Sequence, residues 1–122
     1  MIVAYSSSMR VTTEIWVSAL VRRIFSAGGF AAIVQRGSPE AGAVYILSRD
    51  RLGGLALYSP APQTSYDTSK PQDRLFTPVI GLNNDEIDAK LARERRFDPD
   101  IWIVELEVAD GAIDGMIAID GG

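Results

Sequence analysis

The sequence has no cysteine and no histidine among its 122 residues. These absences exclude thiol nucleophiles, Ser-His-Asp triads, histidine bases and structural zinc sites of the Cys or His type. A disulfide framework is excluded as well. Any chemistry would have to come from carboxylates, hydroxyls, Lys, Tyr or Arg. We therefore predict no catalytic residue, no metal and no cofactor.

A long apolar run and a surplus of basic residues are also missing. Nothing in the chain approaches the 18 consecutive apolar residues of a membrane span, and its beginning lacks the pattern of a signal peptide. Sixteen acidic residues outnumber twelve basic ones, giving a net charge of −4. Binding to a phosphate backbone normally requires the opposite sign. We expect a soluble cytoplasmic protein with neither nucleic acid nor a membrane as its partner.

The length predicts one domain over residues 1–122, large enough to bury about two thirds of the surface that its unfolded chain exposes. Residues 1–11 have little periodicity and are interpreted as a flexible tail, although the apolar residues 2–5 are compatible with a short strand. Residues 110–122 are rich in glycine, and we expect either an extra hairpin arm or a tail there.

The region from Asn83 to Val108 has the clearest local pattern. Asn83 is a good helix cap, and Glu86 stands three residues later, where a capping box places its second partner. Pro99 disfavours helical geometry at Asp98, so the predicted helix ends there. The alternation that follows predicts a strand whose core face carries Trp102, Val104, Leu106 and Val108, with Ile103 indicating that the opposite face is partly covered.

A second helix is predicted between Thr12 or Thr13, either of which is a suitable cap, and the stop at Gly28-Gly29. Its apolar stripe is unusually broad, because Ile15 and Phe25 extend it beyond the residues expected to face a sheet. This excess of apolar surface favours a homodimer, or another protein as partner.

Short strands separated by turns predict the rest of the fold. We place strands at residues 30–36, 43–49 and 55–59, joined as an antiparallel meander, with an edge strand at 74–80. The predicted class is α+β with two layers: an antiparallel sheet of four to five strands with both helices on one face, in the order α-β-β-β-β-α-β.

Three separated segments carry a resemblance to a known family. They are Ile15–Ala19, Ala56–Gln63 and Leu91–Glu105. Together they resemble a family of short alphaproteobacterial proteins, domain of unknown function 1491, over about residues 13–107. The resemblance implies a small stand-alone cytoplasmic protein. It supplies no known catalytic or binding residue.

Candidate ligand-binding residues lie in or beside the polar loop at 60–74 and at the end of the second predicted helix. A long loop held by a rigid sheet is a common place for a site, while arginines near acidic residues are able to hold an anion. The opposite interpretation is structural: loop residues cover the sheet end, and the arginines complement the helix dipole while the acids bond local backbone. The candidates are Tyr58, Gln63, Tyr66, Asp73, Arg74, Arg95, Arg96 and Asp98.

Two functions remain open at this level. The first is a non-enzymatic interaction or regulatory domain that acts as a homodimer through the broad helix or an exposed sheet edge. The second is a protein that binds a small molecule, phosphate or carboxylate, conceivably an enzyme that uses Asp or Glu with Arg. We prefer the first, because every common pairing of nucleophile and base is missing.

Overall fold

The computed structural model describes residues 11–62 and 74–120. The elements, in chain order, are α1 (Thr13–Ser26), β1 (Phe30–Gln35), β2 (Val44–Arg49), β3 (Leu55–Pro60), β4 (Leu75–Val79), α2 (Asn84–Phe97), β5 (Trp102–Glu107), the 3-10 helix η2 (Ile113–Gly115) and β6 (Ala118–Ile119). Apart from Val11, the predicted tail at 1–11 lies outside the described residues.

Helix α1 begins and ends as local chemistry requires. The side chain of Thr12 accepts a hydrogen bond from the Ile15 N–H at 3.2 Å, so Thr12 is the cap. At the other end Gly28 has a φ of +88°, and the N–H groups of Gly28 and Gly29 donate to the carbonyls of Phe25 and Ile24. This is a Schellman motif, which turns the chain back toward β1.

The predicted capping box of α2 is confirmed. Asn83 accepts from the Glu86 N–H at 2.8 Å, and the Glu86 carboxylate accepts from the Asn83 N–H at 2.9 Å. The helix ends at Phe97, immediately before Asp98 and Pro99, as predicted. Each α-helix has 14 residues, and neither of these two has the length and apolar character needed to cross a bilayer.

Over the described residues the sheet is mixed and has six strands in the order β1-β5-β2-β3-β4-β6, so the prediction of an antiparallel sheet of four to five strands was wrong. The predicted meander was also wrong, because β5 lies between β1 and β2, antiparallel to the first and parallel to the second. The reason is burial: β5 is apolar on both faces over Trp102–Val104, as expected for a central strand that lies between two helix layers.

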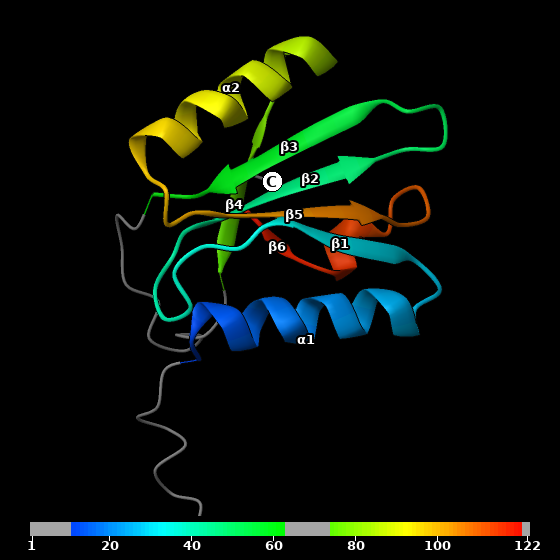
Figure 1. Ribbon diagram of the computed structural model, residues 1–122. Helices are drawn as coiled ribbons and strands as arrows, with labels where there is room; N and C mark the ends of the chain where they lie inside the picture. The colour runs from blue at the N-terminus through cyan, green and yellow to red at the C-terminus, as the bar shows by residue number, and fades with distance from the viewer. Residues whose placement is uncertain (1–10, 63–73, 121–122) are drawn as a thin grey trace, which may run out of the picture.

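The two helices lie on opposite faces of the sheet, and their predicted placement on one face was therefore wrong (Figure 1). Helix α1 packs on the face that carries Trp102, Val104 and Leu106. Helix α2 packs on the face that carries Ile101 and Ile103. The domain has three layers, and α+β remains the right class.

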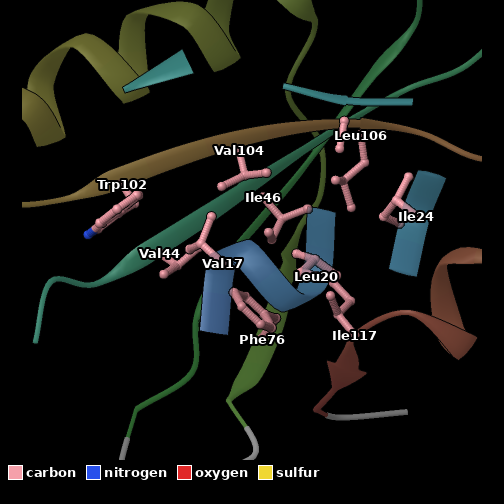
Figure 2. Packing of buried hydrophobic residues seen from close by; sticks show 11 residues of the cluster. Val17, Leu20, Ile24, Val44, Ile46, Phe76, Trp102, Val104, Leu106 and Ile117 are labelled. Atoms are coloured by element: carbon pink, nitrogen blue, oxygen red, sulfur yellow. The ribbon is translucent and has the colours of Figure 1, made fainter. Parts of the chain in front are cut away.

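The larger of the two buried clusters lies between α1 and the sheet. Figure 2 shows Val17, Leu20 and Ile24 of α1 directed at β-strand side chains and at Ile117. Trp102 is 1% exposed, as expected for a core residue. Trp16 is only partly buried and contacts Phe76, with 5.7 Å between the ring centroids.

The segment after Asp110 contributes to the sheet. Strand β6 pairs in parallel with the beginning of β4, matching Leu75 with Ala118 and Phe76 with Ile119. A parallel pairing is not a hairpin, because the two strands run in the same direction. Strand β4, expected at the edge, is next to last, and only its first two residues pair with β6.

Candidate functional site

The predicted ligand-binding residues fall into separate groups. Gln63, Tyr66 and Asp73 lie outside the described residues. Of the remaining five, Tyr58 and Arg74 lie on the α1 side of the sheet. Arg95, Arg96 and Asp98 lie at the end of α2, on the opposite side. These two groups do not form one site.

Arg74 is half-buried at the beginning of α1. Its Nη2 donates to Thr13 Oγ1 at 2.6 Å, and its guanidinium lies over the Trp16 ring, 5.7 Å from the centroid. Burial lowers the pKa of Arg74 from its ordinary value. Thr13, which is fully buried, donates in turn to the Gly42 carbonyl at 2.9 Å. Arg74 therefore joins the beginning of β4 to α1, and Thr13 joins α1 to the link between β1 and β2.

A hollow of about 260 Å³ lies beside Arg74. Trp16, Arg23 and Asp114 contribute to its walls, together with residues 115–118. Arg23 donates to the Met116 carbonyl at 2.8 Å, so this arginine serves the chain that leads into β6. Tyr58 does not line the hollow; burial, followed by the charge of Asp114, raises its pKa.

Arg95 and Arg96 line a different hollow of about 400 Å³, which we call the arginine pocket. Its walls are made by Gln35, Arg36, Ala92, Arg95, Arg96 and Pro99. Antiparallel pairing of β1 with β5 explains this arrangement, because it places the end of β1 beside the beginning of β5, and α2 leads directly into β5. Gln35 Nε2 donates to the Ile101 carbonyl at 3.1 Å and fastens the two segments.

Arg36 is held in a defined position within this pocket. Its guanidinium forms an ion pair with Glu14 and lies over the Trp102 ring, 5.0 Å from the centroid. Trp102 is itself fixed by a bond of 2.7 Å from its Nε1 to the Ser38 carbonyl. A cation over a tryptophan face is favourable, so the ring and Glu14 together orient Arg36.

Asp98 and Glu105 each have a structural partner. Asp98 does not line the arginine pocket; its Oδ1 accepts the Asp100 N–H at 3.0 Å, as the structural interpretation predicted. Glu105 accepts from Arg49 Nε at 2.7 Å, and this bond raises the pKa of Arg49. Within residues 11–62 and 74–120, no three acidic side chains gather in a way that would hold a metal ion.

Sequence reasoning missed Gln35 and Arg36 as neighbours of Arg95 and Arg96. Neither residue has an unusual local context, since a polar pair at the end of a strand is common. Only the pairing of β1 with β5 brings them to α2, and that pairing is a non-local property. The sequence does show that residues Phe30 to Gln35 include no charged residue. Edge strands usually carry charges, so this composition is the local sign that β1 is an unusual edge strand.

A second candidate site is an apolar surface formed by α1 and β1. Four large side chains remain exposed there: Ile15 (61%), Phe25 (51%), Phe30 (48%) and Val34 (53%). The Phe25 and Phe30 rings meet edge to face at 5.8 Å between centroids. Phe30 and Val34 alternate along β1 with Ala31 and Ile33, which pack toward α1, so the four exposed side chains flank the β1 edge from both sides of the sheet. We call these four residues the α1/β1 surface. The predicted excess of apolar residues on the first helix is thus only partly covered by the sheet.

Solved structures support the fold at substantial sequence identity. The solution structure of protein Atu0922 from A. tumefaciens is 41% identical, with a TM-score of 0.76, covering 93% of this chain and 98% of that chain. The crystal structure of a DUF1491 family protein from Caulobacter crescentus CB15 is 34% identical, with a TM-score of 0.73, covering 90% and 99%. A comparison with curated proteins finds no match.

The family model described as "Protein of unknown function (DUF1491)" matches residues 11–113. This range includes both α-helices, strands β1 to β5 and all three segments on which the family resemblance rests. The chain therefore belongs to the DUF1491 family.

Proposed function

We propose that this protein is a small non-enzymatic interaction domain that acts in the cytoplasm as a homodimer, and that two copies meet through the α1/β1 surface. The observation that carries the proposal is the character of β1. Among the residues that the structure describes it is the end strand of the sheet, it is six residues long, and it has no charged side chain. Long apolar edge strands invite pairing with another chain, and natural monomers normally protect them.

The opposite end of the sheet is built differently, which supports the choice of β1. Strand β6 has only two residues, and the part of β4 that extends beyond β6 includes Pro78, which has no N–H to offer another strand. Short edge strands and proline are two of the devices that discourage edge pairing. Strand β1 has one such device, a shift of register between Ile33 and Gln35.

The arrangement of the α1/β1 surface suits a two-fold axis. Helix α1 and strand β1 run in opposite directions, side by side in Figure 1. The Phe25 and Phe30 rings meet at one end of this unit, and Ile15 lies near the other end, one residue after Glu14, which pairs with Arg36. Antiparallel association would place the phenylalanine end of each copy against the Ile15 and Val34 end of its partner. Such an interface uses the same patch twice.

The irregularity near Val34 limits the strand pairing that this arrangement allows. Main-chain bonds between copies are expected over Phe30–Ile33, where the register with β5 is regular. Side chains of the α1/β1 surface must then supply the remaining contact, since a stable interface buries about 1,000 Å² or more. To bury that area, two copies would need both to pair their β1 strands and to pack their α1 helices against each other.

Two carboxylates, those of Asp98 and Glu105, favour this function over an enzymatic one. Asp98 bonds the backbone of Asp100, and Glu105 is paired with Arg49. A general acid or base needs a free carboxyl beside a reacting group. With these two acids engaged, and with no histidine or cysteine in the sequence, a binding role is the better explanation.

Light scattering on the purified protein over a wide concentration range tests the proposal. We expect the mass of two chains, and we expect the double variant F30K/V34K to have the mass of one chain while keeping its circular dichroism spectrum. Both positions are about half exposed, so lysine is tolerated in the fold.

The matched control is Ile80→Lys, which changes an apolar residue that is 85% exposed and lies far along the chain from this surface. This variant should remain dimeric. A single-chain mass for the unmodified protein at every concentration would contradict the proposal, and so would an equal loss of dimer in the control.

A further inference from the structure

We propose that the arginine pocket binds the phosphate group of a small phosphorylated molecule. Three guanidinium groups line it, that of Arg36, which follows β1, and those of Arg95 and Arg96 in the last turn of α2; among residues 11–62 and 74–120, no carboxylate contributes to its walls. This inference concerns a site formed within one chain. It does not depend on self-association.

The charge balance favours an anion. Within residues 11–62 and 74–120, Arg36 forms an ion pair with Glu14, whereas neither Arg95 nor Arg96 forms one with a carboxylate. Two of the three guanidinium groups that line the pocket therefore have no ion pair among these residues. A phosphate monoester carries nearly two negative charges at neutral pH, so it can pair with both of them, whereas a carboxylate carries only one charge.

Geometry also favours a group with several acceptor oxygens. A guanidinium presents its N–H donors as a planar fork, which fits two oxygens of one phosphate. Arg36 is already oriented by the Trp102 ring, and Gln35 is held by its bond to the Ile101 carbonyl. At about 400 Å³ the pocket exceeds the needs of a free phosphate ion and has room for a small organic group attached to it.

One feature of the fold opposes binding and sets its strength. The carboxyl end of α2 carries a partial negative charge, and Arg95 and Arg96 offset it before any ligand arrives. Both side chains are exposed, and exposed ion pairs contribute little each. We therefore expect inorganic phosphate alone to bind with a dissociation constant on the order of millimolar. A phosphorylated molecule that fills the pocket should bind more tightly.

The experiment is a titration of the isotope-labelled protein with inorganic phosphate, followed by NMR at constant pH and constant ionic strength. The Trp102 indole N–H and the Gln35 side-chain amide are the reporters, because both adjoin Arg36. We expect shifts that saturate and that are largest at these two groups, with smaller effects at Trp16. The double variant R95Q/R96Q should bind roughly tenfold more weakly.

Arg93→Gln is the control, since Arg93 is exposed on the same helix but does not line the pocket. It should bind as tightly as the unmodified protein. Acetate at the same ionic strength should bind more weakly than phosphate. Shifts that never saturate, equal losses in Arg93→Gln and in the double variant, or acetate that binds as well as phosphate would each overturn the assignment.

Discussion

The two faces of the sheet are each covered by one helix of 14 residues, yet the two layers are built differently. Helix α1 buries Val17, Leu20 and Ile24 in a wide apolar cluster. Helix α2 buries only Ile87 and Leu91, and polar bonds supplement its contact with the sheet. The comparison shows that the width of the apolar stripe sets how much of each helix is held by packing, since both helices also make polar bonds to the rest of the domain.

Polar contacts on the α2 side centre on Glu94. Its Oε1 accepts from the Tyr45 hydroxyl at 3.2 Å, and its Oε2 accepts from Lys90 Nζ at 3.4 Å. The narrow apolar stripe of α2 does not cover the whole face, and Arg49 and Glu105 form an ion pair on the same face of the sheet. The α1 side has polar contacts as well, and they lie around its apolar cluster: Thr13 donates to the Gly42 carbonyl, Arg23 donates to the Met116 carbonyl, and Glu14 pairs with Arg36. Substitutions on the two sides should therefore differ in size and in pH dependence.

The largest difference is expected for truncation of a buried leucine in each helix. Leu20→Ala should lower the free energy of unfolding by about 4 kcal/mol, and Leu91→Ala by about 2 to 3 kcal/mol. The reason is that Leu20 is 0% exposed inside the larger cluster, whereas Leu91 is 6% exposed at the margin of the smaller one. Urea denaturation measures both values. Equal losses would show that the two layers pack equally well.

Local patterns predicted both helices and the alternation of β5 correctly. Capping residues, the Gly28-Gly29 stop and the Pro99 stop act within a few residues of one another, so each is readable from the chain. The apolar residues at Ile101 and Ile103 also signalled a covered second face. That a second helix covers this face could not be predicted from these residues alone, because it depends on the position of β5 in the interior of the sheet.

Strand order could not be predicted in the same way, because it depends on contacts between distant segments. Nothing near Phe30 or Val44 indicates that β5 separates the two strands. The candidate site could be predicted only in part for the same reason. Arg95 and Arg96 follow from the helix end, whereas Gln35 and Arg36 lie beside them only because β1 pairs with β5. Arg74 was also a candidate, but it has a structural partner in Thr13.

The beginnings of the two helices provide a smaller contrast. Thr13→Val should cost about 2 kcal/mol, since it leaves the Gly42 carbonyl and the Arg74 guanidinium without the buried hydroxyl that joins them. Asn83→Ala should cost about 1 kcal/mol, because it removes a cap that is exposed to water. Thermal and urea unfolding of both variants test the order. A larger loss for Asn83→Ala would reverse the interpretation that α1 is the more tightly docked helix.

The smallest predicted effect concerns pH on the α2 side. Burial, the charge of Glu94 and the hydrogen bond to it raise the pKa of Tyr45 from 10.0 to about 12. The folded protein therefore keeps this hydroxyl protonated at a pH where the unfolded chain ionises it. The resulting stabilisation is fully present below pH 10 and is lost as the pH rises from 10 toward 12.

Because Tyr45 is only partly buried, solvent screening reduces the loss to about 1 kcal/mol or less. Tyr45→Phe removes the titrating group, so the variant should show a shallower decline of urea midpoint with pH than the unmodified protein. Tyr58→Phe on the α1 side is the matched control, since its hydroxyl is not bonded to Glu94. If Tyr58→Phe flattens the profile as much as Tyr45→Phe does, the hydrogen bond to Glu94 is not what distinguishes the two sides of the sheet.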